Sequence, residues 1–277
     1  MNLRNLNKRQ KNILNTVIGL ILLLIAVFVF FMRFNKNSIP INNKKTKTLT
    51  VGMECDYWPY NGALNQKKDE NNIPIFGQSG YAFGYDVLVA KHLAEELKRT
   101  LIIKKISFDG LIPALKAGEI DVIIGGMTPT EKRKKEVDFS NPYFESKINL
   151  FLKKESKRKT YIKIGTQTGT IYSEDEQIKN QFQSINFSYD SYTDLENALT
   201  TDAIDGYIAE SPIADMICKQ KERICEDIAF NDKISICIAV KKDNKELLEA
   251  VNNKLESIKN YVSMKEVIEK VIKYTQG

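Results

Sequence analysis

Two stretches of the chain that lie 84 positions apart repeat the same apolar and acidic residues in the same order. Leu111, Ala114, Leu115, Ile120, Asp121 and Ile124 recur as Leu195, Ala198, Leu199, Ile204, Asp205 and Ile208. In each stretch the spacing indicates a helix, then a turn, then an apolar strand. The repeat therefore predicts two similar α/β lobes built from one helix–strand unit.

Strands and helices alternate around the first copy of the repeat. We expect strands at 49–52, 101–106 and 120–124, a helix at 87–98 capped by Asp86, and a helix at 109–117. This alternation is typical of a mainly parallel sheet. The polar residues 61–80 predict a surface loop or hairpin. Because ligands bind beyond the carboxyl ends of such strands, we expect a cleft between Gly126 and Glu210.

The N-terminal segment carries the longest apolar run, and about 20 such residues suffice to cross a bilayer. Four basic residues precede residues 13–32, which favours a cytoplasmic N-terminus. We expect a tail and transmembrane anchor over 1–33, a linker over 34–47, and a single-pass cell-membrane protein whose binding domain lies outside. The alternative is a cleaved signal peptide, but no A-x-A-like site and no Cys for a lipid anchor follow the run.

The distribution of charge argues against nucleic acid as a partner. The formal net charge is +6, but nine of the 41 Lys and Arg residues and none of the 35 acidic residues lie within 1–47. Residues 48–277 thus carry 32 basic and 35 acidic side chains. The basic excess belongs to the segment beside the membrane, where anionic headgroups favour it.

Cysteine and histidine indicate little chemistry. His92 is the one histidine, so no Cys2His2 zinc site can form, and we expect neither a metal nor a cofactor. Cys218 and Cys225 could close a small disulfide loop in an exported domain, and unpaired thiols are an equal alternative. No Walker A sequence occurs, so nucleotide hydrolysis is not supported.

Two strand-to-helix turns could bind an anion. Thr128, Pro129 and Glu131 occupy the cap, first and third positions of a capping box, which would direct backbone N–H groups beyond the strand. Arg133, one turn later, could bind a carboxylate with two parallel hydrogen bonds. Gly169 and Thr170 form a second turn of this kind. An ordinary surface cap and an ordinary loop are the alternatives.

Acidic and aromatic side chains follow the same strand ends. Glu54 follows the first strand and Glu210 follows the repeated strand, so each could pair with an ammonium group, act as a general acid or base, or lie solvated at a rim. Four aromatic residues cluster nearby, namely Tyr57, Trp58, Tyr60 and Phe108. They could line a small-molecule cleft or simply pack in the core.

Residues from about Thr48 to Tyr274 resemble the amino-acid-binding family of periplasmic-type solute-binding proteins. The resemblance is carried by residues 51–60, 83–87, 108–115, 118–133 and 137–143, above all by the run GGMTPTEKR at 125–133. It implies two α/β lobes joined by two crossing strands that close on a ligand. The first lobe would comprise 48–144 plus 238–277, and the second 145–237.

The resemblance also implies roles for the site residues. Arg133, the Thr128 backbone and Thr170 would hold a ligand α-carboxylate. Glu210, the Gly126 carbonyl and Thr128 would hold an α-ammonium group. Glu54, Tyr57 and Phe108 would meet the side chain, and Met127 and Gly169 complete the expected site. The chain departs from the family where Glu210 replaces the usual Asp and where Ile171 replaces a common hydroxyl residue.

We therefore expect the solute-binding component of an ABC amino-acid importer. It would act as a monomer without catalysis and deliver a free amino acid to a permease and, through it, to ATPase subunits. Glu54 and the aromatic residues favour a basic ligand, arginine first, with glutamine or another polar amino acid as the alternative. A dehydratase and a sensor domain use the same fold and are the rival classes. A sensor needs a further membrane or signalling segment, and no second apolar run is present in the sequence.

Overall fold

The computed structural model describes residues 47–153, 156, 161–174, 184–220, 223–227 and 233–275. Residues from Thr46 to Gly277 form one compact unit. The expected anchor lies outside the described residues, as do the side chains of Cys218 and Cys225. Within the described ranges, no helix combines the length and the apolar character needed to cross a bilayer.

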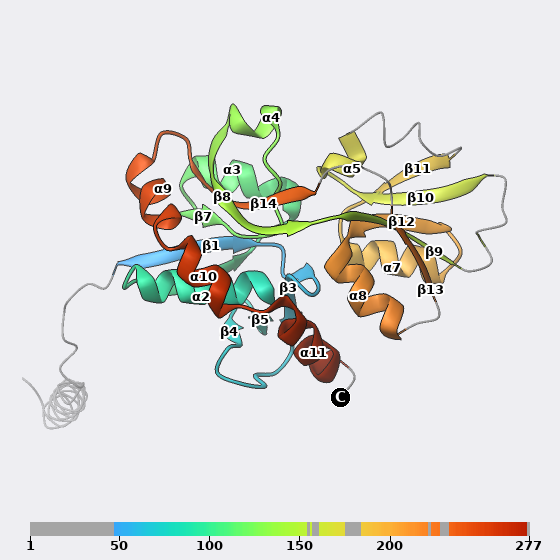
Figure 1. Cartoon of the computed structure of the whole chain (residues 1–277), viewed down its shortest axis with the longest axis horizontal. Coiled ribbons are helices and arrows are strands. Elements are labelled where there is room, and N and C mark those ends of the chain that lie inside the picture. Colours follow the sequence, from blue (N-terminus) through green and yellow to red (C-terminus); the bar gives the residue numbers. More distant parts are fainter. Residues whose placement is uncertain are drawn as a thin grey trace, which may run out of the picture. The chain divides into compact units, whose positions relative to one another are not determined.

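The first sheet has the strand order β6-β1-β7-β14-β8 (Figure 1). Its strands are β1 (Thr48–Met53), β6 (Thr100–Lys105), β7 (Val122–Ile123), β8 (Val137–Ser146) and β14 (Ile234–Lys241). β1 runs parallel to β6 and β7, while β14 is antiparallel to β7 and β8. The helical elements that follow its first strands are α2 (Tyr85–Glu96), the 3-10 turn η3 (Phe108–Gly110), α3 (Leu111–Ala117) and α4 (Glu131–Lys134). Together with the C-terminal helices, these elements form the first lobe.

The second sheet has the same kind of order, β11-β10-β12-β9-β13. Its strands are β9 (Ile148–Lys153), β10 (Ile162–Gln167), β11 (Ser184–Tyr189), β12 (Gly206–Glu210) and β13 (Arg223–Asp227). Its helices are α5 (Ile171–Glu174), α7 (Tyr192–Thr200) and α8 (Ser211–Gln220). The parallel strands β11, β10 and β12 correspond to β6, β1 and β7, and an antiparallel fourth strand follows in both sheets. The prediction of two similar α/β lobes is confirmed.

The correspondence between the lobes extends to individual contacts. Asp121 precedes β7, and its Oδ2 accepts a hydrogen bond from the Thr50 backbone N–H at 2.8 Å. Asp205, 84 positions later, precedes β12 and accepts in the same way from the Lys163 N–H at 2.9 Å. Each carboxylate thus ties the start of one strand to its parallel neighbour, which explains why the sequence repeat includes the acid.

Two strands connect the lobes. β8 pairs with β14 along its length, from Val137 opposite Lys241 to Ser146 opposite Ile234. The chain then continues from β8 through Lys147 directly into β9 of the second sheet (Figure 1). The lobe boundaries expected at 144/145 and 237/238 fall inside these two strands. They stay predictions.

The segment expected as a loop or hairpin forms a small sheet of its own, with the strand order β2-β3-β5-β4. Its strands are β2 (Asp56–Tyr57), β3 (Asn61–Leu64), β4 (Ile73–Pro74) and β5 (Tyr81–Phe83). The chain ends in three helices, which are α9 (Lys245–Asn252), α10 (Leu255–Tyr261) and α11 (Met264–Thr275).

The expected cap of the first long helix is wrong. Gly84, and not Asp86, occupies the cap position of α2. The Asp86 side chain is fully buried and accepts hydrogen bonds from the Tyr143 hydroxyl at 2.6 Å and the Asn61 amide at 2.7 Å. The Asp86 carboxylate therefore forms hydrogen bonds with residues distant in the sequence and does not cap the helix N-terminus.

Candidate functional site

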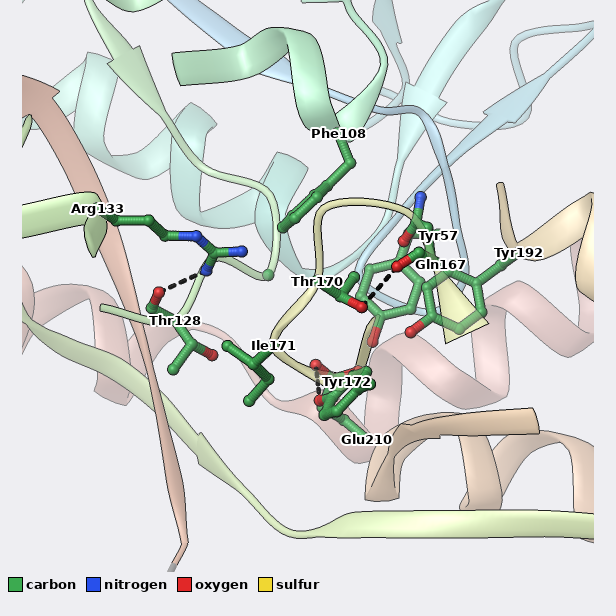
Figure 2. A pocket seen from close by; sticks show the side chains of 11 residues that line it. Tyr57, Phe108, Thr128, Arg133, Gln167, Thr170, Ile171, Tyr172, Tyr192 and Glu210 are labelled. Carbon is green, nitrogen blue, oxygen red and sulfur yellow. Dashed lines mark hydrogen bonds between the residues drawn. The ribbon is translucent and has the colours of Figure 1, made fainter. Parts of the chain in front are cut away.

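A pocket lies between the two lobes, where the carboxyl ends of their parallel strands face each other (Figure 2). It is lined by Tyr57, Phe108, Gly126, Thr128, Arg133, Gln167, Thr170, Ile171, Tyr172, Tyr192 and Glu210. Seven of these residues belong to the ten expected from the sequence. The position matches the expectation that ligands bind beyond strand ends in an open α/β sheet.

Arg133 reaches the pocket from α4. The cap of this helix is Thr130, whose hydroxyl accepts from the Arg133 backbone N–H at 3.1 Å, so the expected cap at Thr128 is wrong by two residues. The guanidinium donates to the Thr128 carbonyl at 2.6 Å and to the Gly169 carbonyl of the other lobe at 2.9 Å. Its carbon lies 5.4 Å from the ring centre of Phe108.

The side chain of Arg133 is buried, and burial lowers its pKa. Two of its five N–H donors are used by backbone carbonyls, and none of the described carboxylates lies within ion-pair distance. A buried cation without a paired anion costs free energy. The group can therefore accept a carboxylate from a ligand, with up to two parallel hydrogen bonds.

Glu210 ends β12 and is buried. Its Oε1 accepts from the Tyr172 hydroxyl at 2.7 Å, while Oε2 has no hydrogen-bond partner among the other described residues. Burial raises the pKa of Glu210 to about 8. Without a cationic partner, the buried carboxyl is largely protonated at neutral pH. A cationic ligand group beside it would favour the ionised form.

Glu54 lies at the end of β1 and is also buried. The turn that follows has Cys55 in the left-handed region, with φ 54°. Glu54 Oε1 accepts from the Gln167 side-chain amide at 2.6 Å, and Oε2 is without a partner within the described part of the chain. Burial raises the pKa of Glu54 to about 7, against the lowering effect of the Gln167 hydrogen bond.

Stacked aromatic rings close one side of the pocket. The rings of Tyr57 and Tyr192 come from different lobes and stack with their centres 4.3 Å apart at 24°. In Figure 2 they lie beside Gln167, while Arg133 and Thr128 lie on the other side and Phe108 lies above. The pocket therefore has a cationic end and an aromatic end.

The three other expected residues do not line the pocket. Glu54 reaches it through its contact with Gln167. Gly169 contributes the carbonyl that Arg133 binds, and its φ of 77° favours glycine. The Met127 side chain is buried in the apolar cluster that includes Leu111, although its carbonyl accepts from the Cys237 N–H at 3.0 Å.

Four lining residues were not among the ten expected, namely Gln167, Ile171, Tyr172 and Tyr192, although Ile171 stands where the family commonly has a hydroxyl residue. The repeat could have found one of them. Tyr192 lies 84 positions after Phe108, and each follows a serine at the cap of its helical turn. Gln167 ends the strand that corresponds to β1, but it lies 113 positions after Glu54, so only the structure reveals this correspondence. No sequence signal identifies Tyr172.

Comparison with known proteins agrees with this geometry. A model of the bacterial extracellular solute-binding proteins of family 3 matches residues 49–274. The ABC transporter arginine-binding protein 1 of Escherichia coli (strain K12) is 31% identical over 196 residues, which is 66% of this chain and 79% of that protein.

Solved structures give the same result. An ancestral arginine-binding protein bound to arginine has a TM-score of 0.67 at 32% identity, over 80% of this chain and 97% of that one. An ancestral arginine-binding protein bound to glutamine has a TM-score of 0.65 at 32% identity, over 80% and 96%. These matches span nearly the whole folded unit. They favour a binding protein over an enzyme, and the chain belongs to the bacterial extracellular solute-binding proteins of family 3.

Proposed function

We propose that the pocket binds a free basic amino acid, arginine first, and that the protein delivers it to an ABC importer. The observation that carries this proposal is the set of three buried charged groups in and beside the pocket. None of Arg133, Glu210 and Glu54 forms an ion pair with a described side chain. The nearest opposite charges, Glu174 for Arg133 and Lys105 for Glu54, act from beyond ion-pair distance. A zwitterion with a cationic side chain supplies one anion and two cations, so each protein charge would gain a partner.

The assignment of ligand groups follows from the two ends of the pocket. The α-carboxylate would bind Arg133 and the turn at Thr170, and the α-ammonium group would bind Glu210. The guanidinium would extend toward Glu54 and the stacked rings of Tyr57 and Tyr192. Because the Tyr57 ring already packs between Tyr60 and Tyr192, Glu54 would supply the main partner of the cation. The arginine-binding relatives named above support this choice of ligand.

Glutamine is the second candidate, and one contact favours it. The Gln167 side-chain amide already donates to Glu54 at 2.6 Å, so this carboxyl beside the pocket accepts an amide N–H. A glutamine ligand would use Oε2 in the same way, without needing an ionised carboxylate. An apolar ligand is disfavoured, since it would leave Glu54 buried and unpaired.

The remaining parts of the proposal concern the setting of the protein. Residues 13–32 would tether it to the cell membrane with the N-terminus inside, and residues 34–47 would link the tether to the folded unit outside. The binding protein would act as a monomer. Closure of the lobes around the ligand would present the loaded form to the permease, which works with ATPase subunits.

A thermal-shift screen of the twenty amino acids tests the proposal. A ligand stabilises the folded state by mass action, so its effect grows with the ratio of its concentration to its Kd. We expect arginine to raise the melting temperature most, with lysine or ornithine next. A larger shift with glutamine would overturn the choice of a basic ligand. No shift with any amino acid would overturn the function itself.

A further inference from the structure

Asp86 lies at the centre of a buried chain of hydrogen bonds in the first lobe. It occupies the first turn of α2 and has no exposed surface. Its Oδ1 accepts from the Tyr143 hydroxyl at 2.6 Å, and its Oδ2 accepts from the Asn61 amide at 2.7 Å. Burial raises its pKa to about 6, although these two hydrogen bonds and a contact from the Gly126 backbone N–H lower it.

One branch of the chain reaches Gly126 in the pocket. Because the Tyr143 hydroxyl donates to Asp86, its lone pairs are free to accept, and it accepts from the Gly126 backbone N–H at 3.3 Å. Gly126 has a φ of 66°. A Cβ there would come within 2.9 Å of the Tyr57 ring. Tyr143 itself belongs to β8, one of the two strands that connect the lobes.

The other branch reaches the turn that carries Glu54. The Asn61 Oδ1 accepts from the Cys55 backbone N–H at 2.8 Å. Cys55 has a φ of 54°, a conformation that costs free energy in a residue other than glycine and persists only where the surroundings hold it. Asn61 is fully buried, and its amide nitrogen is itself held by Asp86.

We propose that Asp86 is the positioning residue of the binding site, holding the Glu54–Cys55 turn through Asn61 and Gly126 through Tyr143. The identity of the ligand in this inference rests on the proposed function, whereas the hydrogen-bond network does not depend on it. Asp86 does not touch the pocket. It acts by fixing the two backbone segments that face the ligand side chain and the ligand α-ammonium group.

The donors and acceptors make the carboxylate necessary. Asp86 accepts at both oxygens, and an amide at this position offers one acceptor and one donor. In Asp86→Asn the new N–H groups have two possible orientations. Toward Asn61 they would meet its amide N–H groups, because the Asn61 oxygen must stay toward Cys55. Toward Tyr143 they would remove the acceptor of its hydroxyl. In both cases one branch breaks. Loss of a buried hydrogen bond predicts roughly a fivefold to hundredfold weaker affinity.

An exchange of the two side chains restores the pattern. In the double variant Asp86→Asn/Asn61→Asp, the new carboxylate at 61 accepts from both Cys55 and the new amide at 86. That amide accepts from Tyr143 through its own oxygen. Every donor again has an acceptor, although the charge has moved. We expect the double variant to recover arginine affinity to within about threefold of the parent, because the network it rebuilds has the same number of hydrogen bonds.

The experiment is calorimetric titration of the full chain and its variants with arginine. Tyr85→Phe is the matched control, since Tyr85 donates to the Tyr143 carbonyl but lies outside the network. We expect it to bind like the parent. Tyr143→Phe removes the hydroxyl from the Gly126 branch and leaves the Asn61 branch intact. Gly126 then keeps only its direct contact with Asp86, so the variant should weaken arginine but not 5-guanidinopentanoic acid, which lacks the α-amino group. Parent-like affinity of Asp86→Asn, or no recovery in a folded double variant, would overturn the inference.

Hydrogen exchange separates this inference from the proposed function. If the parent binds no amino acid, the proposed function is wrong. Amide exchange in the segments around Cys55 and Gly126 still tests whether Asp86 holds these two segments in place. Exchange there should speed up in Asp86→Asn and return in the double variant. Where neither of those two variants folds, Tyr143→Phe decides, since exchange should then rise at Gly126 and stay slow at Cys55. Unchanged exchange at both turns would overturn the inference.

Discussion

The side chains of Glu54 and Gln167 meet at 2.6 Å, although they end corresponding strands of the two lobes. A contact between equivalent positions means that the two strand ends approach each other directly across the cleft. Lys132 and Glu174 form a second interlobe contact at 2.8 Å. The lobes are therefore in a closed arrangement, in which Gln167 occupies one oxygen of Glu54.

Arg133→Ala should nearly abolish binding and leave the fold intact. The proposed partner of Arg133 is a carboxylate that closure buries, and truncation of one member of such a pair costs about 2–5 kcal/mol. That cost corresponds to an affinity loss of roughly thirtyfold to several thousandfold. Calorimetry on the two proteins measures it. Arg133→Lys should lie between them, because an ammonium group cannot form the paired hydrogen bonds. Equal affinity of Arg133→Ala and the parent would remove Arg133 from the site.

Glu54→Gln should weaken arginine much more than glutamine. An amide cannot neutralise a buried guanidinium, so arginine should lose about 2–5 kcal/mol, whereas glutamine can still form an amide hydrogen bond. Competition between the two ligands gives the ratio of affinities. Asp56→Asn is the control, because Asp56 is a neighbouring acid that accepts from Thr193 and does not line the pocket. Unchanged arginine affinity in Glu54→Gln would rule out the basic-ligand assignment.

The two lobes could be predicted from the sequence because the spacing of apolar residues indicates which residues of each helix and strand are buried. The repeat identified α3 and β7 of one lobe as equivalent to α7 and β12 of the other, and the same spacing relates Tyr192 to Phe108. This part of the fold is encoded locally, so a single sequence is enough to find it.

The two wrong helix caps have different physical causes. The Asp86 carboxylate accepts from the Tyr143 hydroxyl, 57 positions away, and a local pattern cannot weigh such a tertiary hydrogen bond against a cap. The cap expected at Thr128 lies instead at Thr130, whose hydroxyl accepts from the Arg133 backbone N–H, so this second error is a local shift of two residues. Tyr172 was not predicted because its contact is also tertiary. Its hydroxyl donates to Glu210 only once β12 has folded beside it.

Arginine binding should release protons at pH 7. Burial raises the pKa of Glu54 to about 7 and of Glu210 to about 8, so both carboxyls are partly protonated in the empty pocket. A cationic ligand favours the ionised forms and lowers both pKa values, so roughly one proton or more should leave at pH 7. The affinity should therefore rise as the pH increases from 6 to 8. Titration in two buffers with different ionisation enthalpies measures the release, which should shrink in Glu54→Gln. A release of zero would contradict the pairing.

Gly206→Ala should destabilise the second lobe more than Gly165→Ala. A Cβ at Gly206 would overlap the Phe151 carbonyl oxygen in the paired strand β9, and backbone there cannot move aside. A Cβ at Gly165 would meet the end of the Leu195 side chain at 2.5 Å, which can rotate. Overpacking of this second kind costs about 1–3 kcal/mol. Urea unfolding of both variants gives the order, and a milder effect at Gly206 would contradict the sheet pairing of β12 with β9.

The protein should remain attached to the membrane through residues 13–32. The run is long enough to span a bilayer, and an apolar core of this length without a small-residue cleavage site favours retention over removal. Intact-mass analysis of the membrane fraction is the measurement, and the expected chain keeps residues 1–33. Insertion of an A-x-A sequence after residue 32 is the matched control, because it should release the binding unit from the membrane. A native chain that begins near residue 35 would contradict the anchor and indicate a signal peptide.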